Sequence, residues 1–355
     1  MSLEAALRAL IAEQGPLTVA EYMTLCLHHP TGGYYATRPA LGEGGDFITA
    51  PLVSQMFGEL VGLWAAETWR RLGAPDPVLL AEVGPGDGTL MGDLLRAGRA
   101  VPGFLQAAEI VLVEPSPPLR AAQQARLAEA HPRLHWAGSL DDLLADRPML
   151  LIANEVLDCL PARQFLRTAE GWTERRVGLD PEGRLSFGLA PVEAPPGSAP
   201  VGAIVEHSPA QAAFTGAVAR RVVAQGGCAL LIDYGRVRPE PGDTLQALRR
   251  HARVDPLDMP GTADLTVWAE FDVVAAAARA EGAAVAGPIP QAAFLGRLGL
   301  VERAGALARA RPDRAETLAR QVERLAAPEQ MGELFKVVAI HRPGDPVPPA
   351  FEEAA

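Results

Sequence analysis

The chain has 355 residues, a length that suits one large domain or a core domain with an inserted lobe. Its 43 acidic and 32 basic residues give a formal net charge of −11, which argues against nucleic acid as a general partner. The only lysine is Lys336, so the Gly-Lys-Ser/Thr sequence of a phosphate-binding loop is absent and lysine Schiff-base chemistry is nearly excluded.

The cysteines and the N-terminal residues indicate in which cellular compartment the protein resides. The three cysteines are widely spaced and odd in number, so they cannot form a disulfide framework or a cysteine-rich zinc site. No apolar run reaches the roughly 18 residues of a membrane span. The opening helix carries Glu4 and Glu13, unlike a signal or transit peptide. We therefore expect a cytoplasmic protein that holds no metal and binds no membrane.

Residues 1–75 are predicted to form an N-terminal helical segment that includes a lid loop. An amphipathic helix opens the chain, and a second one runs from about residue 53 to 71. The loop between them is rich in glycine and aromatic residues. Here Asp46 and Thr49 are candidate contacts to a cofactor and Tyr34 a candidate contact to a substrate. The alternative is that the aromatic side chains of this loop fill the core.

From residue 78 the sequence alternates short apolar runs with helical patterns, which indicates an α/β fold with a doubly wound, mostly parallel sheet. The predicted strands are 78–83, 110–113, 134–136, 149–153, 228–233, 284–287 and 334–340. The predicted helices between them include 89–99, 118–129, 209–224 and 268–281. We expect a seven-stranded, Rossmann-like domain over residues 76–345, followed by a tail at 346–355.

Two segments break this alternation. Residues 163–190 alternate polar and apolar side chains between turn signals, which predicts antiparallel hairpins. Residues 235–266 contain many glycines, prolines and charged side chains and are predicted to be irregular. Both follow strands at the ligand-binding edge of the sheet, so we expect segments 163–208 and 235–266 to form an inserted substrate lobe.

Three glycines follow the first predicted strand. Gly84, Gly86 and Gly88 allow the backbone to turn sharply and to approach a ligand, and the next helix offers free N–H groups. Glu82 precedes them and can order the loop. Glu114 ends the second strand, where a carboxylate can accept hydrogen bonds from ribose hydroxyls. A nicotinamide-dependent dehydrogenase would need a longer glycine spacing, G-x-G-x-x-G.

The glycine spacing resembles motif I of class I S-adenosylmethionine-dependent methyltransferases. In that family the loop lies against the methionine part of the cofactor and the acid of the second strand holds the ribose. The resemblance implies that Ser139 and Leu140, after the third strand, also contact the cofactor. The bland alternative is a tight strand–turn–helix that binds nothing.

Polar residues also follow the fourth predicted strand. Asn154, Glu155 and Asp158 come directly after residues 149–153, at the edge where ligands bind in such sheets. An amide and two carboxylates there could position a nucleophile beside the transferable methyl group, and Asn154 could also contact the cofactor. The alternative is a loop whose polar groups cap the next helix.

Two further acids are candidates for substrate binding. Glu206 could supply a second carboxylate, although Glu206-His207-Ser208 could equally be an ordinary strand end. Asp233 follows the fifth strand and could line the substrate side of the site.

Beyond the general methyltransferase pattern, the chain resembles the MidA-type family over nearly its whole length. The matching segments, each weak alone but specific in their order, are Gly32–Tyr35, Gly45–Pro51, Phe57–Leu60, the glycine loop with Met91 and Asp93–Arg96, Asn154–Glu155 to Gln164–Phe165, Leu231–Gly235, Thr244–Gln246, Gly261–Thr266, Gln291 with Phe294–Leu295, and Met331–Lys336. The mitochondrial relatives in this family are complex I assembly factors with arginine methyltransferase activity. The resemblance therefore implies a methyltransferase that uses S-adenosylmethionine and acts on an accessible arginine of a partner protein.

Two departures from the family pattern bear on this expectation. The family often has arginine at the position of Asp87, and this difference does not affect the expected role of the glycine loop. It usually has aromatic residues where Val156 and Leu157 stand, and their loss could change the substrate. Two alternatives stay open: a non-catalytic assembly factor that binds S-adenosylmethionine, and a methyltransferase of small molecules.

Overall fold

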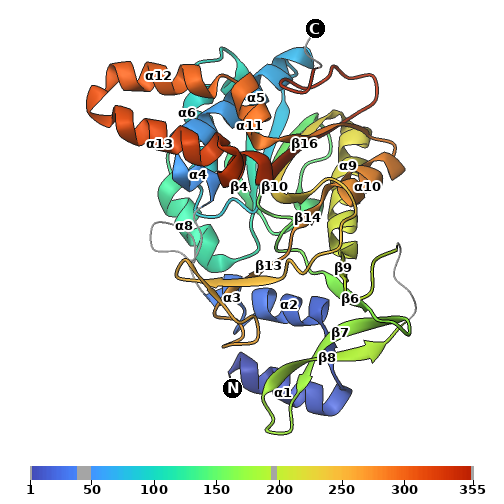
Figure 1. Cartoon of the computed structure of the whole chain (residues 1–355). Helices are drawn as coiled ribbons and strands as arrows, with labels where there is room; N and C mark the ends of the chain where they lie inside the picture. The colour runs from blue at the N-terminus through green and yellow to red at the C-terminus, as the bar shows by residue number, and fades with distance from the viewer. Residues whose placement is uncertain (1, 38–48, 193–197, 353–355) are drawn as a thin grey trace. The chain divides into compact units, whose positions relative to one another are not determined.

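The computed structural model describes residues 2–37, 49–192 and 198–352 (Figure 1). Two compact units make up the chain, and each is assembled from segments that are far apart in the sequence. Unit 1 comprises Met1–Phe47, Leu157–Ala213 and Arg238–Glu270, and unit 2 comprises Ile48–Val156, Phe214–Val237 and Phe271–Ala355. The segment that the sequence analysis assigned to the N-terminal helices is thus divided between the units, because the helix at 55–71 belongs to unit 2.

Seven strands of an eight-stranded sheet belong to unit 2, in the order β15-β16-β10-β5-β2-β3-β4. Its strands are β2 (Val78–Val83), β3 (Ala108–Val113), β4 (Leu134–Ala137), β5 (Met149–Asn154), β10 (Gly227–Arg236), β15 (Ala284–Pro290) and β16 (Phe335–His341). The pairs from β10 to β4 are all parallel, and β16 is antiparallel to both of its neighbours. The predicted doubly wound, mostly parallel Rossmann-like sheet is confirmed.

The sequence of the central strands explains their place in the sheet. Every residue of β2 and β10 is buried, so these strands need apolar side chains on both faces. The helices of unit 2 that the structure describes are α4 (Ala50–Val53), α5 (Gln55–Arg71), α6 (Thr89–Gly98), α7 (Phe104–Ala107), α8 (Pro117–Leu127), most of α9 (Pro209–Gln225), α10 (Phe271–Ala280), α11 (Gln291–Arg297), α12 (Leu300–Ala310) and α13 (Ala315–Ala326). Among them, α7, α10 and α11 contact strands of this sheet directly. Helices α12 and α13 run side by side as a hairpin (Figure 1).

Two glycines let α5 and α6 pack closely together. A Cβ atom on Gly62 would lie 2.8 Å from the carbonyl oxygen of Leu94, and one on Gly58 would lie 2.6 Å from the Cβ of Asp93. No side chain fits at these positions without moving the backbone of α6. This contact matters for the site because α6 begins at the end of the glycine loop.

The last described residues pack against unit 2. The indole Nε1 of Trp64 donates a hydrogen bond to the carbonyl oxygen of Pro349 at 3.2 Å. The guanidinium of Arg297 donates to the carbonyl oxygen of Ala350 at 2.7 Å, and the ring of Phe351 lies 5.8 Å from that of Phe294. The segment predicted as a tail therefore covers helices α5 and α11.

Unit 1 combines short helices with two antiparallel sheets. Its elements include α1 (Leu3–Gln14), β1 (Leu17–Thr18), α2 (Val19–His28), α3 (Tyr34–Thr37), β6 (Arg163–Arg167), β7 (Trp172–Leu179), β8 (Leu185–Pro191), β9 (Ile204–His207), β11 (Gln246–Arg249), β12 (Ala252–Val254) and β13 (Asp264–Thr266). Helix α2 begins at a capping box in which Thr18 and Glu21 satisfy each other's backbone N–H groups. The predicted hairpins are present, since β6 pairs with β7 and β7 pairs with β8 (Figure 1).

The segment 235–266 differs from the sequence prediction of an irregular chain. Strands β11, β12 and β13 form a three-stranded sheet in the order β12-β11-β13. The turn between β11 and β12 consists of Arg250 and His251, both with positive φ values of 53° and 62°. Two-residue hairpin turns of this conformation usually contain glycine or asparagine. Because neither is present, the sequence carried no signal for this hairpin.

The close packing of α5 on α6 gives a test of the fold. We expect Gly62→Ala to lower the free energy of unfolding by about 1–3 kcal/mol, because the added methyl group meets the backbone of α6. Gly296→Ala in α11 is the matched control, since nothing lies within 4 Å of its added Cβ. That control should raise the free energy of unfolding by about 0.5–1 kcal/mol. Urea denaturation measures both, and equal effects would contradict the packing argument.

Candidate functional site

The glycine loop joins β2 to α6 and keeps its backbone open to a ligand. Gly84, Gly86 and Gly88 have φ values of 63°, 56° and 84°, a region that side chains rarely adopt. A Cβ atom on Gly84 would also lie 3.0 Å from the Cγ2 of Val156. Gly88 is the N-cap residue of α6, so the free N–H groups of the first helical turn follow directly. This geometry suits the binding of a polar or anionic group.

Glu82 lies under this loop as a buried acid. Its side chain is 2% exposed, and its Oε2 atom has no hydrogen-bond partner among the described residues. Burial, followed by the negative charges of Asp87 and Glu114, raises the pKa of Glu82 to about 8. The hydroxyl of Thr89 is likewise buried, and it has no hydrogen-bond partner in the part of the chain that the structure describes. Unpaired buried polar atoms are costly, so these atoms are candidates to bind polar groups of a ligand.

Glu114 directly follows β3, the neighbour of β2. It is 4% exposed, and its Oε1 and Oε2 atoms accept hydrogen bonds from the backbone N–H of Ser116 at 2.8 Å and from Gln123 at 3.2 Å. Burial raises the pKa of Glu114, and these two hydrogen bonds oppose that shift. A carboxylate has about four acceptor sites, so Glu114 keeps capacity for two more donors.

Asn154 and Glu155 stand where β5 ends. Glu155 has a φ of 55°, a conformation that costs a residue with a side chain about 1–2 kcal/mol. Its N–H donates to the carbonyl oxygen of Ile232 at 2.8 Å. Its Oε1 accepts from the backbone N–H of Ala50 at 3.2 Å and from the amide of Asn154 at 3.0 Å. Strain of this kind persists only where the surroundings enforce it, and it gathers at functional sites.

The amide of Asn154 leaves an acceptor unused. Because its Nδ2 donates to Glu155, its Oδ1 is the remaining polar atom, and that atom is buried without a hydrogen-bond partner among the described residues. The carbonyl end of β5 therefore presents two kinds of acceptor, a carboxylate and an amide oxygen. Such a pair suits a ligand that carries N–H donors.

The other candidates of unit 2 lie around these groups. Strands β4, β3, β2, β5 and β10 are parallel neighbours, so their carboxyl ends share one edge. Ser139 and Leu140 follow β4, and the N–H of Glu114 donates to Ala137 of the same strand. Thr49 precedes Ala50, whose N–H contacts Glu155. Asp233 is fully buried in β10 and accepts from the N–H of Tyr234 at 2.8 Å.

Three candidates belong to unit 1, and one cannot be placed. Tyr34 is fully buried in the hydrophobic core of unit 1, as the core-filling alternative expected. Glu206 accepts from Gln164 at 2.9 Å and from the backbone and hydroxyl of Thr244 at 2.9 and 2.6 Å. These bonds favour a structural role for its carboxylate. Asp158 is buried, and its carbonyl oxygen accepts from Val267. Asp46 lies outside the described residues.

Gln123, which lies on α8, was not predicted from the sequence as a site residue. This side chain is fully buried and contacts both the glycine loop and Glu114. The available signal was its spacing from Leu119 and Leu127, which places it on the apolar face of the helix. A polar side chain that is buried at such a position needs hydrogen-bond partners.

A second missed contact fixes the end of the loop. Arg126, also on α8, forms an ion pair with Asp87 at 2.7 Å. The other carboxylate oxygen of Asp87 accepts from the N–H of Thr89 at 3.0 Å. Asp87, noted as a departure from the family pattern, therefore connects the loop to α8.

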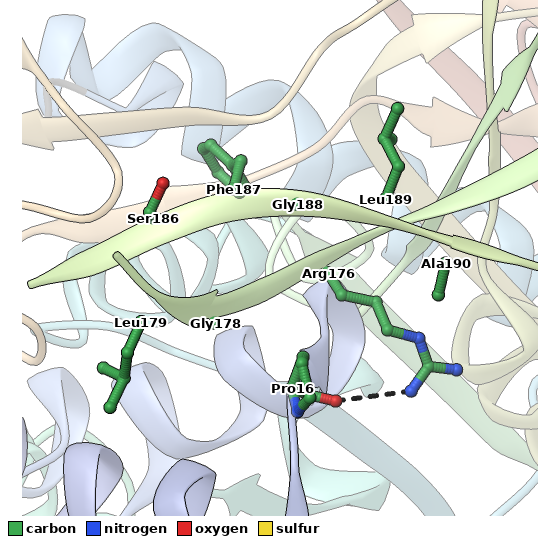
Figure 2. A pocket seen from close by; sticks show the side chains of 9 residues that line it. All are labelled: Pro16, Arg176, Gly178, Leu179, Ser186, Phe187, Gly188, Leu189 and Ala190. Atoms are coloured by element: carbon green, nitrogen blue, oxygen red, sulfur yellow. Dashed lines mark hydrogen bonds between the residues drawn. The ribbon is translucent and has the colours of Figure 1, made fainter. Parts of the chain in front are cut away.

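Unit 1 contains a separate, shallow hollow of about 210 Å³ on the β7–β8 hairpin (Figure 2). Arg176 lies at one side and donates to the carbonyl oxygen of Pro16 at 3.3 Å, and Phe187 and Leu189 project from β8. None of the candidate site residues lines it. Within the described residues, no helix combines the length and the hydropathy of a membrane span.

Comparisons with known proteins agree with the geometry of unit 2. A family model of S-adenosyl-L-methionine-dependent methyltransferases matches residues 60–289. The mitochondrial protein arginine methyltransferase NDUFAF7 homolog of Drosophila melanogaster is 35% identical, with 96% of this chain and 84% of that protein covered. Human mitochondrial protein arginine methyltransferase NDUFAF7 is 34% identical, with 93% and 81% covered. The mitochondrial names of these relatives contradict the predicted cytoplasmic location, which was therefore wrong.

Solved structures agree with this assignment. A methyltransferase-like protein from Burkholderia thailandensis, solved with S-adenosyl-homocysteine bound, is 30% identical and superposes with a TM-score of 0.83 over 99% of this chain and 93% of that one. A native structure from the same organism gives a TM-score of 0.87 at 30% identity, with 99% and 94% covered. The chain belongs to this family of S-adenosyl-L-methionine-dependent methyltransferases.

Proposed function

We propose that this methyltransferase methylates an arginine side chain of a partner protein. The observation that carries the proposal is the acceptor pair at the end of β5, where the strained Glu155 holds its carboxylate beside the unused amide oxygen of Asn154. The curated relatives, which are named protein arginine methyltransferases, support the choice of arginine.

The residues around the glycine loop fit the cofactor. When bound, S-adenosylmethionine supplies a methyl group on a positively charged sulfur atom. The unpaired buried oxygen of Glu82 is suited to its amino group, and the spare acceptor capacity of Glu114 is suited to its ribose hydroxyls. The residues that would hold it are Thr49, Glu82, Gly84, Gly86, Gly88, Glu114, Ser139, Leu140 and Asn154, together with Asp46 from outside the described residues.

The acceptor pair matches the chemistry of a guanidinium group. Arginine carries five N–H donors and no acceptor, and it stays positively charged at neutral pH. The carboxylate of Glu155 is an acceptor, and the Oδ1 of Asn154 adds a second acceptor, while one N–H of the Asn154 amide donates to Glu155. We propose that Glu155 binds the guanidinium as a charge-assisted pair and orients one nitrogen for reaction.

Proton balance gives Glu155 a second task. The reacting nitrogen gains a methyl group and loses a proton, and the methylated guanidinium keeps its single positive charge. A carboxylate that already accepts hydrogen bonds from this group is placed to take the proton. Two secondary proposals remain. Asp158 is proposed as a further carboxylate for the substrate, and Asp233 is proposed to line the substrate side of the site.

The first experiment measures transfer of a radiolabelled methyl group to protein arginine. We expect Glu155→Gln to lower the transfer rate at least about 100-fold, because the pairing charge and proton acceptor are lost. Its affinity for S-adenosylhomocysteine, measured by calorimetry, should stay near the wild-type value. Glu129→Gln, which changes an exposed acid in the turn that follows α8, is the control and should leave both unchanged.

Other outcomes of this experiment would contradict the proposal or favour an alternative function. Label in lysine or in a small molecule would contradict arginine as the acceptor. Binding of S-adenosylhomocysteine without any transfer by the wild-type protein would favour the non-catalytic assembly factor. Gly86→Val should abolish cofactor binding, since a branched side chain conflicts with the φ of 56° and fills the approach to the loop.

Glu82 gives a prediction about pH. Its pKa is about 8 in the folded protein against an ordinary value of 4.5, so between these values the unfolded chain loses a proton that the folded chain keeps. The folded state is therefore destabilised as pH rises through this window, by at most about 1.4 kcal/mol per pH unit. Glu82→Gln removes this titration. The free energy of unfolding of the variant, relative to that of the wild type, should therefore rise from pH 5 to pH 8. Urea denaturation at several pH values measures both proteins. A difference in free energy of unfolding that stays constant with pH would contradict the raised pKa of Glu82.

A further inference from the structure

Gln123 connects three parts of the cofactor edge through one side chain. Its Nε2 donates to the carbonyl oxygen of Gly86 at 2.7 Å and to the Oε2 of Glu114 at 3.2 Å. Its Oε1 accepts from the indole Nε1 of Trp136, on β4, at 3.0 Å. The side chain is fully buried, so no water competes for these bonds.

The partners determine how the amide is oriented. The indole of Trp136 can only donate, so it must face the oxygen of Gln123. A backbone carbonyl and a carboxylate face the nitrogen, and both act as acceptors. All three contacts therefore select the same orientation, and neither leucine nor glutamate at position 123 could reproduce it.

We propose that Gln123 is a positioning residue for cofactor binding: its amide holds the glycine loop and the carboxylate of Glu114 at the separation that the cofactor requires. The proposal rests on the proposed cofactor roles of Gly86 and Glu114 and is independent of which group accepts the methyl. By donating to Glu114, Gln123 also favours the ionised carboxylate, which is the stronger acceptor for ribose hydroxyls.

Calorimetry with S-adenosylhomocysteine tests this without any methyl transfer. We expect Gln123→Leu to raise the Kd about 30-fold, since the loop and the carboxylate lose a shared donor. Gln291→Leu is the matched control, because Gln291 is a fully buried glutamine of unit 2 whose amide donates to the carbonyl oxygen of Leu325 of α13 at 2.9 Å. It should lose stability without a comparable change in Kd.

A modified ligand shows whether Gln123 positions Glu114 for the cofactor or only stabilises the fold. If Gln123 acts through Glu114, the effect of Gln123→Leu should shrink to below about 3-fold for the 2′-deoxyribose analogue of S-adenosylhomocysteine, which lacks one hydroxyl. An equal effect on both ligands would overturn the proposal, as would wild-type affinity for S-adenosylhomocysteine in a folded variant.

Two more variants keep the test decisive if Gln123→Leu does not fold. Trp136→Phe removes the donor that orients the amide at a half-buried position, and it should raise the Kd about 5-fold. Gln123→Glu should bind better at pH 6 than at pH 8, relative to the wild type, because only the protonated acid can donate to Gly86 or Glu114. Unchanged affinity in Trp136→Phe together with no pH effect in Gln123→Glu would overturn the proposal.

Discussion

The burial of β2 between two parallel neighbours is the constraint on which the rest of unit 2 depends. All of its residues are buried, and it is hydrogen-bonded to β3 on one side and to β5 on the other. Because these strands run parallel, Glu82, Glu114 and Asn154 reach the same edge although they are up to 72 residues apart in the sequence. The site is therefore a consequence of strand order and register, and the loops add to it only local detail.

Electrostatics at this edge are unfavourable without a ligand. Burial raises the pKa of both Glu82 and Glu114, and the negative charge of Asp87 adds to the effect at Glu82. Arg126 compensates Asp87 from α8, but the Oε2 of Glu82 has no partner among the described residues. In the proposed site a cofactor that carries an ammonium and a sulfonium group would relieve this repulsion. Such a site would lower the stability of the free protein and favour a cationic ligand.

The edge of the sheet could be predicted from sequence because apolar runs end there in glycines or acids. The contacts that refine it could not. One partner of Glu206 is Thr244, 38 residues away, and no local pattern connects them. The β11–β12 hairpin was missed because Arg250 and His251 adopt a conformation that normally indicates glycine or asparagine. Gln123 was missed because a single glutamine on an apolar helix face shows nothing of what it contacts.

The place of β16 has a consequence for how the protein is made. This strand, Phe335–His341, lies between β10 and β15, so the last strand that the structure describes occupies an interior position of the sheet. During synthesis β10 and β15 emerge first and cannot pair with their neighbour until residue 341 has left the ribosome. Until then both strands expose unpaired backbone edges, which favour aggregation. Completion of the methyltransferase sheet is therefore a late step, and a chaperone that shields these edges would raise the yield of folded protein.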